Sequence, residues 1–359
     1  MKPYVIKGIF QPGSDKYAER ELIKFGVKNF TKNENFFEFV GHPKLLVKLN
    51  CKSRIFSGFE IKLMEGKARF AKDLQKLISQ VKWSDFLTTQ KIKIKADSFR
   101  SKLYHEGKIK EIVEKTLSGI YDNEATGNTE QKISVRIVEN RGTISIDSSG
   151  EHLHKRGFAV LKEKAPLRET IASAMISEIY ARDDIDHIID PMCGSGTILS
   201  EALAMTYDLN IGKYRGFSFQ NWASFPERNI HCFDEPSEKN NRKLKVTGFD
   251  IDVKSVLDSR ENLSVFNESD YRIEKKDFFD ISEIPDSSVI LTNPPYGKRI
   301  MRTGDAVKIY KKLSDLASKG VKVGFLIPAA MKSKININVK PVFTFYNGNI
   351  KTDFLTFNL

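Results

Sequence analysis

The residues most able to do chemistry form the stretch Asn293-Pro294-Pro295-Tyr296, which ends an apolar, β-branched run. The asparagine carbonyl oxygen can accept a hydrogen bond from an exocyclic amino group and orient its lone pair without removing a proton. The two prolines hold the loop rigid and leave backbone carbonyls as further acceptors. The tyrosine offers a flat face to a base taken out of its stack. The stretch fits methylation of a planar amine; a strand followed by a Pro-Pro turn is the alternative interpretation.

Three aspartates and a glycine-rich turn also follow predicted strands. Asp190 precedes the turn 191–197, and Asp250 and Asp277 follow later strands. The Gly194-Ser195-Gly196 spacing lacks the third glycine of a dinucleotide site, and a carboxylate at Asp190 suits a cationic amino-acid moiety better than a pyrophosphate. Asp250 can accept from two ribose hydroxyls, and Asp277 from an adenine amino group. Taken singly, each aspartate could equally be a strand-end cap; taken in order, they predict a cofactor site.

The spacing of apolar residues predicts which elements position these side chains. Strands alternate with helices in the second half, which indicates a parallel, doubly wound α/β sheet with ligands at the carboxyl ends of its strands. The first half predicts a smaller α+β region. Expected strands are 5–10, 36–40, 53–63, 91–96, 132–138, 142–147, 185–190, 246–252, 273–277, 289–292, 321–327, 343–346 and 354–357; expected helices are 16–24, 44–49, 70–81, 107–121, 167–180, 198–205 and 253–266.

The positive charge of the chain is concentrated at its N-terminal end. The formal net charge is +12, and residues 1–150 hold 28 Lys and Arg against 18 Asp and Glu. This asymmetry predicts a polyanion-binding module joined to a near-neutral domain. Lys93 and Lys95 share one face of the strand 91–96, and Arg100 and Lys102 follow it, so these four could track a phosphate backbone. A solvated, lysine-rich surface is the alternative.

Other classes of protein are disfavoured by composition. No apolar run approaches the roughly 18 residues of a membrane span, and the N-terminus has no signal-peptide pattern, so we expect a cytoplasmic protein without a membrane partner. The three cysteines have no CxxC spacing, and His231-Cys232 is an isolated pair, so we expect neither a disulfide framework nor a bound metal. We expect a monomer.

The motifs from residue 166 onward resemble those of the class I S-adenosylmethionine-dependent methyltransferases. The stretch 190–197 is similar to their first motif, Asp250 and Asp277 to their ribose and adenine positions, and 293–296 to their amino-methylating signature. The segments 153–158 and 165–170 are more narrowly similar to the RNA guanine-N2 branch that carries an N-terminal THUMP domain. The segment 211–222 resembles that branch's insertion, which here is longer and polar over 231–245. Residues 1–150 match more loosely.

This resemblance implies a complete domain plan and a set of functional residues. The implied domains are a ferredoxin-like domain (1–60), a THUMP RNA-binding domain (61–150), a linker (151–165) and a Rossmann-like methyltransferase domain (166–359). The implied cofactor is S-adenosyl-L-methionine, with S-adenosyl-L-homocysteine as product. The implied catalytic residues are Asn293, Pro294, Pro295 and Tyr296. The implied cofactor contacts are Pro166, Leu167, Asp190, Pro191, Met192, Cys193, Gly194, Ser195, Gly196, Thr197, Asp250, Ile251, Asp277, Phe278 and Asn293. The candidate RNA contacts are Lys93, Lys95, Arg100, Lys102, Arg156 and Arg299.

The sequence thus predicts methylation of the 2-amino group of a guanosine in RNA, with tRNA as the expected partner near its acceptor stem. Ribosomal RNA is the main alternative, since enzymes acting on it also carry THUMP domains. DNA adenine-N6 methylation uses the same Asn-Pro-Pro-Tyr signature, but the basic N-terminal module speaks against it. A non-catalytic RNA-binding protein would fail to bind the cofactor, and a nicotinamide oxidoreductase would bind NADH. Cys193 as a nucleophile is disfavoured because it lies inside the cofactor turn.

Overall fold

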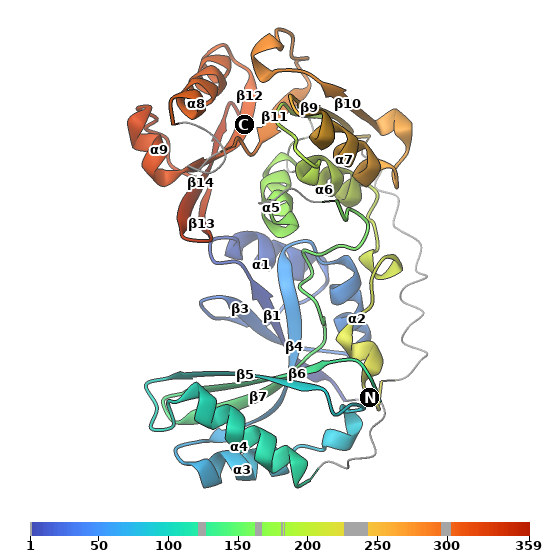
Figure 1. Cartoon of the computed structure of the whole chain (residues 1–359), viewed down its shortest axis with the longest axis vertical. Coiled ribbons are helices and arrows are strands. Elements are labelled where there is room, and N and C mark those ends of the chain that lie inside the picture. The colour runs from blue at the N-terminus through green and yellow to red at the C-terminus, as the bar shows by residue number, and fades with distance from the viewer. Residues whose placement is uncertain are drawn as a thin grey trace. The chain divides into compact units, whose positions relative to one another are not determined.

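The computed structural model describes residues 2–120, 127–161, 167–180, 182, 184–225, 243–295 and 303–359 (Figure 1). The chain divides into two compact units. Unit 1 comprises Met1–Phe10, Leu22–Leu153 and Arg215–Glu235, and unit 2 comprises Gln11–Glu21, His154–Tyr214 and Pro236–Leu359. Each unit contains one seven-stranded sheet.

The sheet of unit 1 has the strand order β2-β3-β1-β4-β7-β6-β5. Its strands are β1 (Tyr4–Phe10), β2 (Phe30–Lys32), β3 (Phe36–Gly41), β4 (Phe56–Lys67), β5 (Ile92–Phe99), β6 (Gln131–Val138) and β7 (Arg141–Asp147). The helices between them are α1 (Asp15–Lys24), α2 (Pro43–Lys52), α3 (Ala71–Ser79) and α4 (Glu106–Ser118). The first four strands with α1 and α2 follow the βαββαβ order of a ferredoxin-like fold. Only β5 and β6 pair in parallel among the strands of this sheet that the structure describes.

Side chains alternate between a buried and a polar face of this sheet. Ile6, Ile61 and Ile146 are paired across β1, β4 and β7, and each is at most 1% exposed. The neighbouring positions on the same strands are Lys7, Glu60 and Ser145, which point to the opposite face because successive strand residues alternate. Helices α3 and α4 pack on the buried face, α3 against β4 and β7 and α4 against β5. We call the opposite side the polar face.

The expected domain plan differs from the structure at three places. The boundary after residue 60 falls inside β4, which pairs with β1 in its first half and with β7 in its second. Residues 215–225, expected in the methyltransferase domain, instead pack in unit 1, where the Trp222 ring contacts Tyr4 and Phe86. Conversely, α1 begins in unit 2, where Tyr17 donates a hydrogen bond to Glu178.

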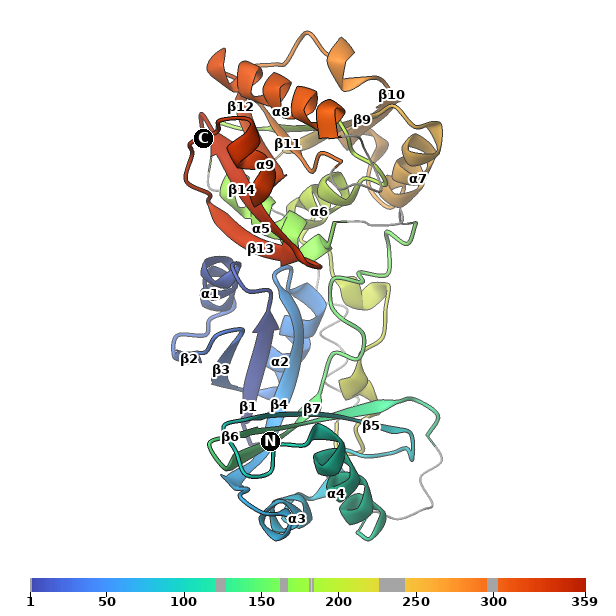
Figure 2. The same cartoon turned by 60° about the vertical axis from the view of Figure 1, so that its left-hand side comes forward.

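The sheet of unit 2 has the order β10-β9-β8-β11-β12-β14-β13. Its strands are β8 (His187–Asp190), β9 (Lys245–Asp250), β10 (Tyr271–Lys275), β11 (Ser288–Thr292), β12 (Lys322–Pro328), β13 (Phe343–Asn347) and β14 (Ile350–Phe357). Its helices are α5 (Glu169–Tyr180), α6 (Thr197–Thr206), α7 (Val253–Leu263), α8 (Thr303–Ser318) and α9 (Ala329–Lys334). Strands β8 to β12 are parallel, and β14 is antiparallel to β12 and β13 (Figure 2). The predicted Rossmann-like fold class is confirmed.

Burial explains why the central strands are so apolar. All five residues of β11 are buried, as expected for a parallel strand covered on both faces. Helix α8, which the sequence analysis missed, places Ile309, Tyr310 and Leu313 in the core beside β12. Among the described residues, no helix is both long enough and apolar enough to cross a membrane.

The expected linker is divided between the units. The Arg215 guanidinium donates to the carbonyl oxygens of Ser149, Glu151 and His152, which holds the first part in unit 1. From His154 the chain belongs to unit 2. There Gly157, at φ +90°, passes so close to Tyr214 that a Cβ would lie 2.4 Å from its carbonyl oxygen.

Arg156 was expected to contact RNA, and this prediction is wrong. Its side chain is 0% exposed, and its guanidinium donates to both carboxylate oxygens of Glu201 on α6, at 2.9 and 3.0 Å. The Ser173 hydroxyl on α5 donates to the same carboxylate at 2.6 Å. A buried and fully paired guanidinium is not available to a phosphate, so Arg156 fastens the second part of the expected linker to α5 and α6.

Candidate cofactor and acceptor site

The predicted polar positions gather at one edge of the sheet of unit 2. Asp190 ends β8, Asp250 ends β9, and Asn293 directly follows β11. These three strands are neighbours in the order β9-β8-β11 and run parallel, so their carboxyl ends meet at the same edge. Asp277 follows β10, the next strand outward. This is the edge at which doubly wound sheets bind ligands.

The turn after β8 is held against β9 by hydrogen bonds from two of its backbone N–H groups. The Cys193 N–H donates to the Phe249 carbonyl oxygen at 2.9 Å, and the Gly194 N–H donates to Asp250 Oδ2 at 2.9 Å. Gly194 and Gly196 have φ of +51° and +80°, a region that favours glycine. Both glycines are therefore required by the shape of the turn itself.

Asp190 is fixed between the turn and β11. It is 2% exposed, and its Oδ1 accepts from the Met192 N–H at 3.2 Å and from the Thr292 hydroxyl at 2.6 Å. Because Thr292 immediately precedes Asn293, its hydrogen bond ties Asp190 to the start of the Asn-Pro-Pro loop. The cofactor turn and the Asn-Pro-Pro loop are thus positioned by one shared contact, which the sequence analysis did not identify.

Gly196 offers a sharp test of this turn. A Cβ at this position would lie 2.4 Å from Ser259 Oγ on α7, in addition to the strain of its positive φ. Gly196→Ala should therefore displace the turn and weaken cofactor binding by about tenfold or more. Gly320→Ala is the matched control, because Gly320 has φ +89° but nothing within 4 Å of the added atom. Calorimetric titration of both variants with S-adenosylhomocysteine should show a loss of affinity only for Gly196→Ala; equal affinities would contradict the role of the turn.

Asp250, the expected ribose contact, and Ile251, another expected cofactor contact, are both accessible to a ligand. Asp250 accepts one backbone N–H on each oxygen, from Gly194 at Oδ2 and from Asp252 at Oδ1, both at 2.9 Å. Each carboxylate oxygen can accept a second bond, so the carboxylate can still bind two hydroxyls. Ile251 is 65% exposed at the sheet edge, which leaves its side chain open to a planar ligand.

The two residues expected on the adenine side differ in their surroundings. Asp277 Oδ1 accepts the Phe279 N–H at 2.9 Å, which caps the short helix Phe278–Asp280. The Phe278 side chain is 4% exposed and packs in the core with Ile290 and Ile309. The Phe278 ring therefore packs in the core, and the expected contact of Phe278 with the cofactor stays a prediction.

Asn293 carries an unsatisfied hydrogen-bond acceptor. Among the residues that the structure describes, its side-chain Oδ1 is buried and accepts no hydrogen bond. Buried polar atoms without partners are rare in folded proteins because the lost hydration is not replaced. Pro294 is buried and Pro295 is half-buried, so the loop beside this oxygen is packed. The oxygen is therefore positioned to accept a donor from a ligand.

Three predicted site residues, Pro166, Tyr296 and Arg299, lie outside the described residues. The other predicted cofactor contacts lie in or beside the turn, where Pro191, Cys193, Ser195 and Thr197 are buried and Met192 is half-buried; Leu167, just before α5, is also buried. Asn262 on α7 was missed: its amide donates to the Ser195 carbonyl oxygen at 2.9 Å and to that of Leu161 at 2.8 Å. Its only sequence signal is a polar residue on the inner face of an amphipathic helix.

Cys193 is unsuited to nucleophilic catalysis. Burial raises the pKa of its thiol well above the ordinary value, and the charges of Asp190 and Asp250 raise it further. The thiol therefore stays protonated at neutral pH, whereas the thiolate is the nucleophile. Cys193→Ala should change kcat by less than about threefold if the thiol only fills space. Methyl-transfer kinetics check this, and a loss of activity with cofactor affinity intact would contradict it.

The remaining candidate RNA contacts lie in unit 1. Lys93 and Lys95 are exposed on the polar face of β5, where Lys95 lies 3.8 Å from Asp97. Arg100, at φ +47°, places its guanidinium over the Phe99 ring, and Lys102 places its ammonium over Phe70. Cations beside aromatic rings are typical of surfaces that bind single-stranded nucleic acid.

Comparison with known proteins gives this arrangement a family. The chain is 26% identical to the Synechocystis protein named "Putative RNA methyltransferase slr0064", over 97% of this chain and 94% of that protein. It is also 26% identical to the ribosomal RNA large subunit methyltransferase K/L of Cellvibrio japonicus, over 89% of this chain but 46% of that protein. The chain thus spans about half the length of the K/L relatives it matches.

Solved structures agree with the fold. A structure described as a possible methylase from Clostridium difficile 630 matches with a TM-score of 0.85 and 26% identity, over 99% of this chain and 98% of that one. TrmN from Thermus thermophilus matches over 99% of both chains with a TM-score of 0.71; at 16% identity this likeness shows the fold alone. The profile of the UPF0020 family, described as the RMKL-like methyltransferase domain, matches residues 156–338, half of the chain. The chain therefore belongs to the UPF0020 family of RMKL-like methyltransferase domains.

Proposed function

We propose that this protein transfers a methyl group from S-adenosyl-L-methionine to the exocyclic 2-amino group of a guanosine in RNA. The observation that carries the proposal is the buried Oδ1 of Asn293, which finds no hydrogen-bond partner in the described part of the chain, at the carboxyl edge of a methyltransferase sheet. An acceptor held there needs a donor, and an exocyclic amino group supplies one.

The predicted cofactor, with S-adenosyl-L-homocysteine as product, is confirmed at the level of family and fold. A protein of the same fold, SMU.472, was solved complexed with SAH; it matches with a TM-score of 0.84 at 23% identity. The cofactor supplies an electrophilic methyl group on a sulfonium. The residues of this chain fit it, because a buried carboxylate at Asp190 suits its cationic amino-acid part and Asp250 suits its ribose.

Each residue then has a role in positioning. Asn293 Oδ1 and the Pro294 carbonyl oxygen accept hydrogen bonds from the amine and direct its lone pair toward the methyl carbon. Tyr296 stacks on the flipped guanine. The nitrogen forms its bond to carbon as the bond to sulfur breaks, and a proton leaves the alkylated nitrogen afterwards. Catalysis of this kind depends on orientation and electrostatics, and a general base is not required.

The acceptor we place first is large-subunit ribosomal RNA. Several relatives that match most of this chain carry the name of ribosomal RNA large subunit methyltransferase K/L. Because those proteins are about twice as long, their activity is carried over to this chain as part of the proposal. The tRNA acceptor stem, expected from the sequence, is the second candidate; the basic N-terminal module, whose +10 charge is spread over residues 1–150, suits either RNA.

The test is transfer of labelled methyl groups to deproteinised ribosomal RNA and, separately, to unmodified tRNA, followed by nucleoside analysis. The proposal predicts labelled N2-methylguanosine in the ribosomal RNA. Labelled N2-methylguanosine in tRNA alone would support the proposed reaction and identify tRNA, instead of ribosomal RNA, as the acceptor. Labelled N6-methyladenosine, or cofactor binding without transfer to either RNA, would contradict the proposal.

A further inference from the structure

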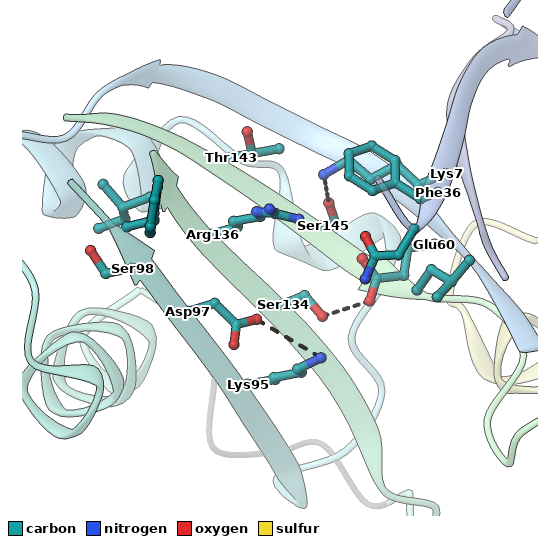
Figure 3. A pocket seen from close by; sticks show the side chains of 14 residues that line it. Lys7, Phe36, Glu60, Lys95, Asp97, Ser98, Ser134, Arg136, Thr143 and Ser145 are labelled. Atoms are coloured by element: carbon teal, nitrogen blue, oxygen red, sulfur yellow. Dashed lines mark hydrogen bonds and ion pairs between the residues drawn. The ribbon is translucent and has the colours of Figure 1, made fainter. Parts of the chain in front are cut away.

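The polar face of unit 1 contains a hollow of about 310 Å³ (Figure 3). Side chains from β1, β3, β4, β5, β6 and β7 line it, so it spans most of the width of the sheet. Phe36 on β3 stands at one side of the hollow and Phe99 on β5 at the other. The hollow belongs wholly to unit 1 and lies on a different sheet from the cofactor site.

The hollow exists because the sheet is curled. Strands β3 and β6 are four steps apart in the strand order, which would separate them by about 19 Å in a flat sheet. The Arg136 guanidinium on β6 nevertheless lies 5.6 Å from the centre of the Phe36 ring on β3. Only a concave polar face brings these side chains together. The same curvature buries Lys7 and Ser145 at its centre, to 8% and 1% exposure.

Two cations in the hollow, Lys7 and Arg136, form no ion pair with any carboxylate among the described residues. The Lys7 ammonium donates to Ser145 Oγ at 3.2 Å and lies 5.6 Å from the Phe36 ring centre. Among the described residues, neither Lys7 nor Arg136 forms an ion pair, whereas the nearby Lys62 pairs with both Glu38 and Glu65. Burial lowers the pKa of Lys7, and the charges of Lys62 and Arg136 act in the same direction, against the opposing effect of Glu60 and Glu38. An anion between the two cations would replace the hydration that the Lys7 ammonium has lost on burial.

The other groups of the hollow suit more than a bare anion. Glu60 accepts a hydrogen bond from the Ser134 hydroxyl at 2.7 Å and keeps acceptor capacity toward the hollow. Phe99 is 58% exposed and carries the Arg100 guanidinium at 5.0 Å from its ring centre. Cations for a phosphate, acceptors for hydroxyls or base N–H groups, and an exposed ring for stacking are the features with which proteins bind unpaired nucleotides.

Three hydrogen bonds hold the Phe99 side of the hollow in place. The Phe99 carbonyl oxygen accepts the Glu139 N–H at 3.1 Å. Asn140, at φ +63°, accepts the Lys102 N–H on its side-chain oxygen at 2.9 Å, and its own N–H donates to Ser101 Oγ at 3.0 Å. A wall that is already fixed loses little conformational entropy when a ligand binds.

We propose that this hollow binds one unpaired nucleotide of an RNA strand, with the phosphate contacted by Lys7 and Arg136 and the base stacked against Phe99. The inference rests on the proposed function only in taking RNA as the ligand. It assigns unit 1 a defined nucleotide site next to Arg100 and Lys102, in addition to the general attraction of its positive charge.

The experiment measures binding of a fluorescein-labelled, single-stranded ten-nucleotide RNA to the full chain by anisotropy at several salt concentrations. Arg136→Gln should weaken binding about tenfold and make the slope of log K against log salt shallower by about 0.7, the value for one lost phosphate contact on a single strand. Phe99→Ala should weaken binding about tenfold or more with the slope unchanged, because stacking releases no counterions. Both residues are exposed, and thermal melts followed by circular dichroism establish that both variants fold.

Lys115→Gln is the matched control, since it also removes one positive charge from unit 1 but lies exposed on α4, on the other side of the sheet. It should leave affinity and slope unchanged. The same RNA in a duplex should bind without any effect of Phe99→Ala. If Arg136→Gln and Phe99→Ala bind single-stranded RNA like Lys115→Gln, the inference is overturned.

Methyl transfer by the same preparations separates this inference from the proposed function. Binding that depends on Arg136 and Phe99, without methyl transfer to any RNA, would support the hollow and contradict the proposed function. Methylation of RNA, together with RNA binding that is unchanged by Arg136→Gln and Phe99→Ala, would support the proposed function and contradict the nucleotide site in the hollow.

Discussion

Replacing Asn293 with alanine is expected to lower the rate of methyl transfer by about 10²- to 10³-fold, the range seen when one preorganised polar group is removed from a catalytic site. The physical reason is that Oδ1 is buried and, within the described ranges, accepts no hydrogen bond before the acceptor arrives. Its hydrogen bond therefore forms with the acceptor amine, and the amine loses its orientation when the oxygen is removed. Single-turnover kinetics with saturating cofactor measure this rate.

The control for this prediction is Asn338→Ala, because Asn338 is an exposed asparagine of the same unit, outside its helices and strands. It should retain the wild-type rate. Titration of Asn293→Ala with S-adenosylhomocysteine should show a far smaller change in affinity than in rate. A loss confined to cofactor affinity, or a rate within about threefold of wild type, would contradict the assignment of Asn293 to the acceptor amine.

Replacing Arg156 with methionine is expected to lower the free energy of unfolding of unit 2 by about 3–5 kcal/mol. The change leaves the Glu201 carboxylate, 1% exposed, without its cation. Urea unfolding followed by circular dichroism measures the loss. Arg272→Met removes the same type of side chain from an exposed pair with Glu274, at 70% and 37% exposure, and should cost about 1 kcal/mol or less.

The double variant Arg156→Met/Glu201→Met distinguishes a buried ion pair from a packing defect. It should recover most of the stability, because no buried charge is left unpaired. It should also bind single-stranded RNA like the wild type, since Arg156 is not available to phosphates. A loss of RNA affinity in the folded double variant would restore the original expectation that Arg156 contacts RNA.

The sheet of unit 2 could be predicted because its signals are local. Strands β8, β9 and β11 are short and largely apolar, and Asp190, Asp250 and Asn293 lie at or directly after their carboxyl ends. The rule that parallel strands present their carboxyl ends at one edge then brings these residues together. Helix α8 was missed although Ala306, Ile309, Tyr310, Leu313 and Ala317 follow helical spacing into the core.

Long-range packing could not be predicted in the same way. Arg156 lies in a charged segment, so the sequence suggested that its side chain is exposed. Its partner Glu201 is 45 residues away along the chain. The available signal was on the partner: Glu201 is the only charged residue in the apolar helix α6, and such a residue usually needs a buried partner. The place of Trp222 in unit 1 depends on contacts with Tyr4 and Phe86, which no local pattern encodes.

The domain boundary expected after residue 60 differs from the structure for a related reason. Strand β4 is twelve residues long, and its first part pairs with β1 while its second part pairs with β7. The chain therefore has no break after residue 60, where a domain boundary was expected. Predictions from composition identified the basic character of this region. The concave face that gathers Lys7, Phe36 and Arg136 arises only from the curvature of the complete sheet.

The most direct test of the central claim is methyl transfer to RNA in which every guanosine is replaced by inosine, which lacks the 2-amino group. RNA containing 7-deazaguanosine, which keeps that amino group and lacks only the N7 acceptor, serves as the control. We predict transfer to the deazaguanosine RNA and none to the inosine RNA. Equal transfer to both would place the methyl group elsewhere and contradict the assignment of Asn293 to a guanine 2-amino group.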